Sequence, residues 1–599
     1  MHRRTFLLSS GLAAAGAPGS ARAQGRGTLR YGFPVAETGF DPAQINDLYS
    51  RTICANIFEA LYTYDYLARP VLLKPCTAVA LPEVGDDFRS FTVRIRPGIV
   101  FADDPAFKGR TRELTASDYV YSIKRFFDPR TKSPLFNTFE RAGMLGMASL
   151  RDEAVRSGRF DYDREVDGLR ALDRYTLRIR LAEPRPRLVY LLADHAQTGA
   201  VAREVVEFHG ERIMEHPVGT GPFRLAQWRR SSRIVLERNP GFREEVFDER
   251  PAAGDAVAQR ISARLRGRRL PMVDRVEVYI VEESQPHWLA FLNGEHDLIG
   301  SVPSEFVVTA VPNGVLAPGL ARRGIQLDRQ VISAIAFTYF NMDDPVVGGY
   351  TPPQVALRRA LSLAWDVDEE IRLQWHGQAV VAQGPIPPQT TGYDPSWVSG
   401  MNVFDRARAK ALLDTYGFVD RDGDGWRERP DGSPLVLEMA NQPDKNGRDF
   451  QQLWKRNLDA IGVRIAFSYG QWPELLRLAR AGRMMMWQLG NSASSPDGGE
   501  FLDLAYGPNK GFGNFSRFDL PAFNTLHRRQ NLLPDGPERN EILREQVRLL
   551  VAYAPMKVRV HQVANGLSQP WLTGFLRHPF LRGWWKFVDV DAAAQAAGR

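Results

Sequence analysis

The sequence predicts an α/β fold that is divided into several packing units. The chain has 599 residues, and a domain with one hydrophobic core usually holds about 100 to 250 residues. Between residues 435 and 489, strand patterns alternate with amphipathic helix patterns. Strands joined by helices of this length are typical of a sheet with crossover connections and helices on its faces.

The second half of the chain has the clearest pattern of elements. A capping box with proline in the first turn at Thr351–Gln354 predicts the start of a helix. Ligands of α/β sheets bind beyond the carboxyl ends of strands, and Trp487 and Asn491 are predicted to lie at such an end. Beyond the capping box we expect strands at 435–439, 463–469 and 484–489, and helices at 449–461 and 473–481.

The first half is less regular. Apolar and polar residues alternate at 91–95, 175–181 and 276–280, which predicts strands, and a second capping box at Thr115–Asp118 predicts a helix. The region 243–270 has no clear periodicity and carries several arginines. We interpret it as a solvated insertion; a patch that meets a membrane or a partner is the alternative.

Composition and charge exclude several classes of protein. A chain with 44% hydrophobic and 25% charged residues is ordinary globular protein, not a disordered, collagenous or disulfide-stapled one. A net charge of +7 is too dilute to indicate a nucleic-acid partner. Cys54 and Cys76 could pair in an oxidising compartment; the alternative is that both are small buried hydrophobes.

Residues 1–23 read as an export signal. Basic residues precede a short, weakly apolar stretch. Ala21-Arg22-Ala23 follows with the small residues typical of a signal cleavage site, so we expect cleavage before Gln24. Arg3 and Arg4 resemble a twin-arginine signal, but the general export route stays open, as does an unprocessed flexible terminus. No later run of about 18 apolar residues occurs. We therefore expect a soluble periplasmic protein.

The sequence contains no HExxH, GxSxG, P-loop or CxxC motif, so no catalytic residue and no cofactor are expected. One string has the spacing of a calcium loop: Asp420, Asp422 and Asp424 at positions 1, 3 and 5, with Asp431 at position 12. A turn between a helix and a strand explains the same residues, and we favour the turn.

Several stretches together resemble the peptide/nickel class of periplasmic solute-binding proteins of ATP-binding-cassette (ABC) importers, the bacterial extracellular solute-binding proteins of family 5. Each stretch alone is a plausible helix start or turn, but their order along nearly the whole mature chain is specific. The stretches are FEALYTYD (58–65), FTVRIRPGIVF (91–101), LTASDYVYSIKRFFDP (114–129), HPVGTGPF (216–223), VALRRALSLAWD (355–366) and DRARAKALLDTYGFVDRDGDG (405–425).

The resemblance implies a two-lobed periplasmic-binding-protein fold, type II-like, with mixed sheets flanked by helices and a discontinuous first lobe. The chain would cross between the lobes near 281–283 and 552–555. The expected parts are 28–61, 215–281 and 553–591 for the main sheet of lobe I, 62–214 for a subdomain appended to lobe I, and 282–552 for lobe II.

The resemblance also implies a function. The protein would be a non-enzymatic, monomeric binding component that captures a peptide or peptide-like solute by closing its lobes, and delivers it to a membrane permease with its ATPase. A metal chelate, haem or another small solute is the main alternative ligand. An exported hydrolase that uses a carboxylate pair including Asp41 is the alternative from another class.

Candidate ligand contacts follow from family positions. Phe340 is as plausible in a core as in a cleft, and Asp41 could merely cap a turn. Peptide-binding relatives place an aspartate shortly after the tryptophan matched by Trp487, where it pairs with the free amino terminus. Here the nearest acidic residue after Trp487 is Asp497. The sequence therefore does not require the ligand to be an unmodified peptide. The candidates are Thr38, Phe40 and Asp41 on lobe I, and Phe340, Asn341, Trp487, Asn491, Asp497, Phe512 and Asn514 on lobe II.

Overall fold

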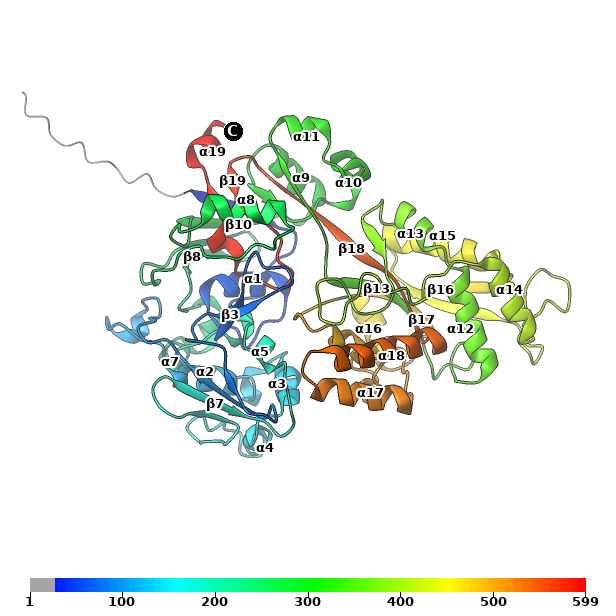
Figure 1. Ribbon diagram of the computed structural model, residues 1–599, viewed down its shortest axis with the longest axis horizontal. Helices are drawn as coiled ribbons and strands as arrows, with labels where there is room; N and C mark the ends of the chain where they lie inside the picture. The colour runs from blue at the N-terminus through cyan, green and yellow to red at the C-terminus, as the bar shows by residue number, and fades with distance from the viewer. Residues whose placement is uncertain (1–26, 599) are drawn as a thin grey trace, which may run out of the picture.

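The computed structural model describes residues 27–598. The expected export signal and its cleavage site lie outside these residues. Within them, no helix is both long enough and apolar enough to cross a membrane. Figure 1 shows two bodies side by side, linked by the long strand β18 (Met556–Ser568).

One mixed sheet runs through both bodies. The pairs β1–β10 and β15–β16 are parallel, whereas β18 is antiparallel to each of its partners. The strand order is β16 (Arg464–Tyr469), β15 (Val436–Asn441), β17 (Met486–Ser492), β13 (Ala334–Phe340), β18, β11 (Leu298–Ile299), β1 (Thr28–Phe33), β10 (Arg275–Ile280), β9 (Arg233–Arg238) and β8 (Phe223–Arg229), with β12 (Gln326–Val331) and β14 (Ala379–Val381) also paired to β18.

Strand β18 belongs to both halves of this sheet. Its first residues pair with β13, and its last residues pair with β12 and β11. Strands β12 and β13 follow one another in the chain, separated only by Ile332 and Ser333. Two neighbouring segments, β12–β13 and β18, thus run from one half to the other. The lobe boundaries expected from the sequence stay a prediction.

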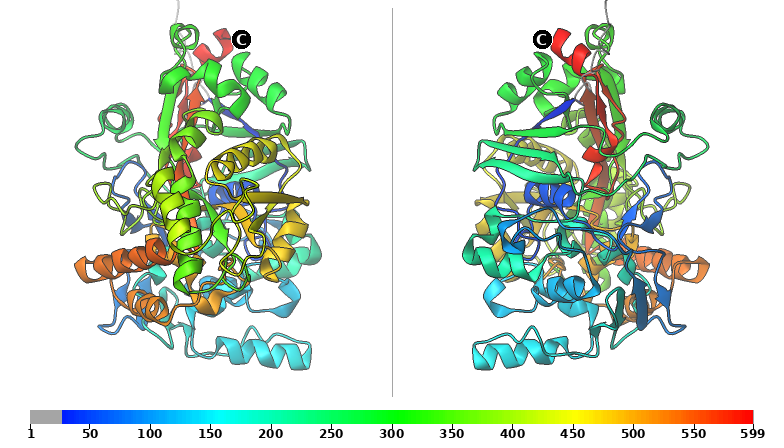
Figure 2. Two further views of the ribbon diagram at one scale, coloured as in Figure 1. Left: turned by 90° about the vertical axis from the view of Figure 1, so that its right-hand side faces the viewer. Right: turned by 90° about the vertical axis from the view of Figure 1, so that its left-hand side faces the viewer.

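We call lobe I the body that holds β1 and β8 to β10. A subdomain with its own core lies at the end of the molecule opposite the C-terminus (Figure 2). Its sheet has the order β4 (Glu83–Val84), β5 (Ser90–Arg94), β7 (Thr176–Arg180) and β6 (Leu169–Ala171), beside the pair β2 (Tyr62–Tyr64) and β3 (Leu73–Pro75). The helices of this half are α1 (Leu48–Ile57), α2 (Ala116–Lys124), α3 (Phe136–Ala142), α4 (Met147–Ser157), α5 (Leu188–Leu191), α6 (His195–Thr198), α7 (Arg203–His209), α8 (Ala256–Leu265), α9 (Ser284–Leu292), α10 (Ser304–Ala310), α11 (Pro318–Arg322) and α19 (Ala592–Ala597), with the short strands β19 (Leu572–Thr573) and β20 (Asp589–Val590).

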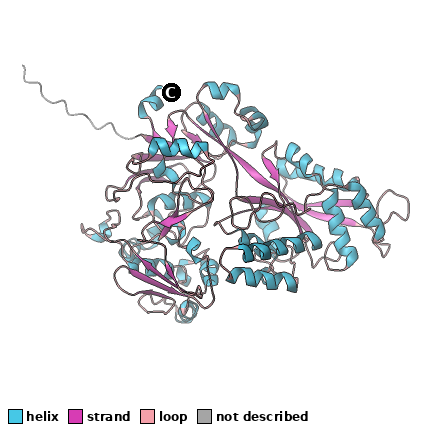
Figure 3. Cartoon of the chain, in the orientation of Figure 1, coloured by secondary structure: helices cyan, strands magenta, loops and turns pink. Residues whose placement is uncertain are grey.

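We call lobe II the body built on β13 and β15 to β17. Its sheet is covered by helices on both faces (Figure 3), and each face has a core. One core contains Trp365 and Trp454, whose ring centroids are 4.3 Å apart; the other contains Trp487 and Phe501. The helices are α12 (Pro352–Ala364), α13 (Val367–Leu373), α14 (Arg406–Thr415), α15 (Lys445–Asp459), α16 (Trp472–Arg480), α17 (Pro521–Leu532) and α18 (Pro537–Tyr553).

The α/β fold class is confirmed, and so are the strands and helices expected between residues 435 and 489. Both predicted capping boxes are present, at the starts of α2 and α12. The interpretation of 243–270 as a solvated insertion is wrong for part of that region. Asp255 caps α8 through the backbone N–H groups of Val257 and Ala258, and Ile261 and Leu265 of α8 pack into a core. Arginines on the other positions of α8 obscure this apolar face in the sequence.

The two cysteines do not form a disulfide in this structure. Cys54 and Cys76 are both free and buried, which matches the alternative interpretation. Cys54 packs in the core of lobe I. Burial raises the pKa of both thiols, and that of Cys76 to about 12, so neither is a reactive thiolate at neutral pH.

Candidate functional site

A cleft of about 700 Å³ lies between the lobes, next to β18. Its wall is built from both halves of the molecule. Tyr31 of β1 and Tyr49 of α1 come from lobe I, Asn441 and Trp487 come from lobe II, and Gln562 comes from β18. A volume of this size falls in the range of small-molecule sites, about 300 to 1,000 Å³.

On lobe I, capping of α1 places Tyr49 at the cleft. The Asp47 side chain accepts a hydrogen bond from the backbone N–H of Ser50 at 2.8 Å and so starts the helix. Tyr49 then lies in the first turn, and its ring packs on Phe33 with centroids 4.9 Å apart. The wall of the cleft on this side is therefore fixed by packing rather than by a loop.

On lobe II, the carboxyl end of β15 and the start of α15 form the wall. Asn441 ends β15, and its side-chain amide donates to the Gly447 carbonyl at 2.8 Å. Asp444 caps α15 by accepting from the Gly447 N–H at 2.7 Å. These bonds hold a strand-to-helix turn against the cleft, where ligands of α/β sheets usually bind.

The polar groups of the cleft are mainly neutral amides. An amide both donates and accepts, so it can bond to the N–H or the C=O of another backbone. Charged lining groups are fewer, and Arg577 already lies 3.7 Å from Asp328. Burial lowers the pKa of His287, which also lines the cleft and is neutral at pH 7. The lining amides include Gln374, Gln378, Gln442, Gln488, Gln562 and Asn565.

Aromatic rings supply the apolar part of the wall. The rings of Trp487 and Trp472 pack with centroids 5.1 Å apart. Trp375 is oriented by its indole N–H, which donates to Glu370 at 3.0 Å. Trp487 is only 1% exposed, so in this structure most of the aromatic contact area comes from the half-buried rings of Trp375 and Tyr49.

The candidate residues on lobe I lie outside this lining. Phe40 is fully buried against Trp228, with centroids 4.6 Å apart. Asp41 is 1% exposed and forms a two-pronged ion pair with Arg125 at 2.6 and 2.8 Å. Thr38 is exposed, and its hydroxyl donates to Asp47 at 2.6 Å. In this structure Phe40 and Asp41 hold lobe I together.

Most candidates on lobe II also pack or form hydrogen bonds inside the lobe. Phe340 is fully buried in a core, and the side chain of Asn341 donates to the carbonyls of Gly482 and Met484. Asn514 is fully buried and donates to two backbone carbonyls. Phe512 is 84% exposed. Asn491 is half-buried within β17 and is not in the lining of the cleft.

Trp487 is the one candidate residue that lines the cleft within the described part of the chain. The expectation that both residues lie at the carboxyl end of a strand is correct for Asn491, the last residue but one of β17, and wrong for Trp487. Both lie inside β17 (Met486–Ser492), with Trp487 near its amino end. Because β17 is antiparallel to β13, its amino end lies beside the carboxyl end of β13, and this pairing could not be known from the local pattern.

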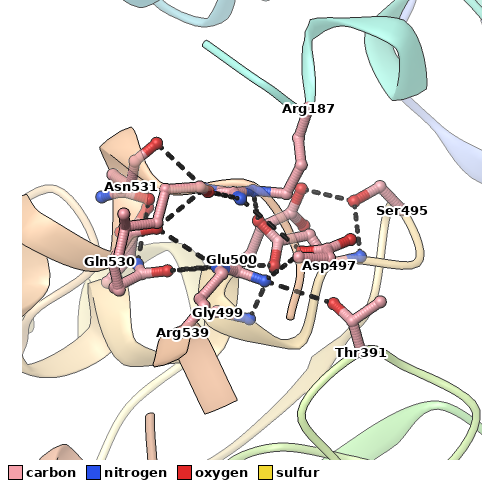
Figure 4. A network of polar contacts seen from close by, with 12 residues as sticks. Arg187, Thr391, Ser495, Asp497, Gly499, Glu500, Gln530, Asn531 and Arg539 are labelled. Atoms are coloured by element: carbon pink, nitrogen blue, oxygen red, sulfur yellow. Dashed lines mark hydrogen bonds and ion pairs between the residues drawn. The ribbon is translucent and has the colours of Figure 1, made fainter. Parts of the chain in front are cut away.

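Asp497 lies at a direct contact between the lobes (Figure 4). Its carboxylate pairs with Arg539 of α18 at 2.5 Å and with Arg187 of the subdomain at 2.8 Å. Arg187 also donates to the backbone carbonyls of Leu533, Gln530 and Asn531 at 2.7 to 3.1 Å, at the carboxyl end of α17. Asp497 is thus engaged by two arginines, and we call the Arg187 contact the interlobe latch.

A second carboxyl group lies beside the latch. Glu500 accepts hydrogen bonds from the hydroxyls of Ser495 at 2.6 Å and Ser494 at 3.0 Å. Burial, helped by the charge of Asp497, raises the pKa of Glu500 to about 7. Glu500 is therefore divided between its neutral and charged forms at neutral pH.

The calcium-loop pattern forms a compact acidic turn. Asp420, Asp422 and Asp424 come together with Glu428, with one oxygen of each within 4.8 Å of the others. Asp431, expected at position 12, instead accepts from the hydroxyl and backbone N–H of Ser433. The oxygens of Asp420 accept backbone N–H bonds from within the loop, which is what the favoured turn interpretation expects.

Most residues of the cleft carry no signal in the sequence. Asn441 is an exception, because it lies just after the predicted strand 435–439 and ends the observed strand β15. Tyr49 and Gln562 carried no comparable signal. Gln562 becomes part of the wall only because β18 crosses between the lobes, and that crossing depends on pairing with segments far away in sequence.

Two lobes joined by crossing strands around a mostly neutral cleft define a protein that holds a small solute. Residues 73–513 match the family model described as bacterial extracellular solute-binding proteins, family 5 Middle. The chain belongs to this family.

Relatives and solved structures agree over nearly the whole chain. Di/tripeptide-binding protein 2 of Pseudomonas aeruginosa (strain UCBPP-PA14) is 24% identical over 94% of this chain and 95% of its own. Periplasmic oligopeptide-binding protein OppA of Salmonella typhimurium is 23% identical over 95% and 93%. The fold is similar to that of HbpA2 from Haemophilus parasuis, with a TM-score of 0.71, 18% identity and coverage of 94% and 100%. It is also similar to DppA from Helicobacter pylori in complex with peptide STSA, with a TM-score of 0.68, 19% identity and coverage of 94% and 98%.

Proposed function

We propose that this protein is the binding component of an ABC importer and captures peptides or peptide-like solutes in the cleft between its lobes. The observation that carries the proposal is the lining of the cleft. Neutral amides and aromatic rings line it, and such a wall can bond to a peptide backbone without requiring one side-chain sequence. The names of the peptide-binding relatives support the same ligand class.

The binding cycle follows from the two segments that cross between the lobes. A ligand that contacts both lobes favours the closed state, and reversing a 99:1 preference for the open state needs about 5.5 kcal/mol of differential binding. We infer that the lobes rotate about β18 and the β12–β13 junction. The closed form is then what a membrane permease and its ATPase recognise.

The setting follows from the same proposal. The protein acts as a monomer without catalysis, in the periplasm, after export by the signal in residues 1–23 and cleavage before Gln24. Trp487 stays in the proposed contact set, and Tyr49, Asn441 and Gln562 join it because they line the cleft.

Ligand-dependent melting with chemical analysis of the ligand tests the function. A peptide that binds only the folded state raises the melting temperature, by mass action, and should be recovered intact. Turnover of the peptide would instead support the hydrolase alternative. Native mass spectrometry of protein purified from its own periplasm identifies the ligand: a mixture of peptides supports the proposal, and a single metal complex or haem overturns it.

Replacing Trp487 tests the position of the site. In Trp487→Phe we expect the ligand-induced fluorescence change to be reduced, with the rest coming from Trp375, and the affinity to fall about threefold to tenfold, because part of an aromatic contact is removed. Trp426→Phe is the matched control, since Trp426 is a half-buried tryptophan of lobe II that does not line the cleft. If Trp487→Phe keeps both the signal and the affinity, the ligand does not contact this wall.

A further inference from the structure

A separate pocket of about 240 Å³ lies on lobe II and shares no lining residue with the cleft. It is enclosed by α12, by the loop that leads into α14, and by the junction between α18 and β18. Its volume lies below the range of about 300 to 1,000 Å³ for drug-sized ligands, so it suits a smaller solute. The lining residues are Arg359, Ser362, Leu363, Ser399, Gly400, Met401, Val403, Arg408, Leu550, Val551, Ala554 and Met556.

The charged residues that line this pocket are all basic. Arg359 of α12 and Arg408 of α14 are exposed, and neither guanidinium has an ion pair or a hydrogen-bond partner within residues 27–598. No acid is among the lining residues that the structure describes. Two positive charges at one pocket repel each other, and an anion bound between them removes this repulsion.

A third cation lies behind the wall of the pocket. Lys557 of β18 is 1% exposed. Its ammonium donates to the Ser362 carbonyl at 2.8 Å, and to the Ser362 hydroxyl and the Met401 carbonyl at 3.2 Å. Among the described residues no carboxylate pairs with Lys557, because Glu370, whose charge acts on it, is already paired with Arg559 at 2.8 Å. A buried charge without a counter-ion is costly, and burial lowers the pKa of Lys557 to about 7.

The rest of the wall is mainly apolar. Every lining residue from the α18–β18 junction is apolar. Leu363 and Val551 are half-buried and Val403 is 43% exposed, so part of this apolar surface is in contact with water. Removing such surface from water is favourable by about 25 cal/mol per Å². The pocket therefore offers cationic and apolar surface to the same ligand.

We propose that this pocket binds a small amphiphilic anion, with an oxyanion head group on a short apolar chain. Arg359 and Arg408 hold the head group, because a guanidinium matches the oxygen atoms of an oxyanion. The chain covers the apolar wall, and the ammonium of Lys557 adds a favourable charge behind Ser362 and Met401. This site is independent of the solute that the cleft takes.

Calorimetric titration with four small probes at equal ionic strength tests the site. Hexanoate and hexanesulfonate distinguish a planar from a tetrahedral head group, hexanol lacks the charge, and acetate lacks the chain. We expect at least one of the two hexyl anions to bind about tenfold more tightly than both hexanol and acetate. The proposal is wrong if hexanol or acetate binds as tightly as the better hexyl anion.

Two double variants show where the anion binds. In Arg359→Gln with Arg408→Gln we expect the affinity for the better hexyl anion to fall about tenfold, to that of hexanol. Arg260→Gln with Arg264→Gln is the matched control, since these are exposed arginines of α8 without an ion pair among the described residues. The control should bind like the wild type. An equal fall in both double variants, or no fall in the first, excludes this pocket as the site.

The pH dependence of binding tests the part of Lys557. A bound anion favours the charged form of Lys557 and raises its pKa above the value of about 7 in the free protein, so binding takes up a proton. Both hexyl anions stay ionised from about pH 6 to about pH 9. The affinity should therefore be highest below neutral pH and fall about threefold or more as the pH rises to about 9. Equal affinity at both ends of this range overturns the proposal.

Discussion

Replacing Arg187 by methionine is expected to open the protein and to weaken ligand binding by tenfold to over a hundredfold. Arg187 donates to three backbone carbonyls at the negative end of α17 and pairs with Asp497. Hydrogen bonds to a charged group are worth about 1.5 to 3 kcal/mol. Because the latch joins two lobes, its loss changes the ratio of closed to open protein, and the apparent affinity falls with the closed fraction.

Two measurements check this expectation. Small-angle scattering of the unliganded protein should show a larger radius of gyration for Arg187→Met than for the wild type, and calorimetry should show the weaker affinity. Arg185→Met is the matched control, because the Arg185 side chain has no partner among the described residues. The latch has no role in closure if Arg187→Met keeps both the wild-type radius and the wild-type affinity.

The sequence predicts the local elements of this fold well, because the cause of each is local. The capping boxes at Thr115 and Thr351 satisfy backbone groups within one helical turn. Strand β18 is different. Its partners β11, β12, β13 and β14 lie far from it in sequence, so neither the crossing between the lobes nor the cleft beside it has a local signal.

The residues of the candidate site could be predicted from the sequence only in part, for the same reason. Trp487 was found through the family position, because the strand pattern placed it at the wrong end of its strand. Asp41 was misplaced because its partner is 84 residues away, and a sequence alone does not reveal that a carboxylate is already neutralised. Asp497 is a similar case, because its two arginines come from α18 and from the subdomain.

Removing the Asp41 carboxylate is expected to be the most destabilising of these changes. Asp41→Ala leaves Arg125, which is 4% exposed, as an unpaired buried charge, and breaking a buried pair in this way costs about 3 to 5 kcal/mol. We expect lobe I to unfold at clearly lower denaturant concentration. In the double variant Asp41→Ala with Arg125→Met much of this loss should be recovered, because no buried charge is then left without a partner.

The pH dependence of stability gives an independent check on Asp41. Burial opposes its ionisation, but the Arg125 guanidinium outweighs burial and lowers the pKa of Asp41. A carboxyl group whose pKa is lower in the folded state stabilises the protein above its unfolded pKa, and this stabilisation is lost as the pH falls through the folded value. The wild type should therefore lose stability towards low pH more steeply than the double variant. If Asp41→Ala instead melts like the wild type but fails to bind peptide, Asp41 belongs to the ligand site and not to the core.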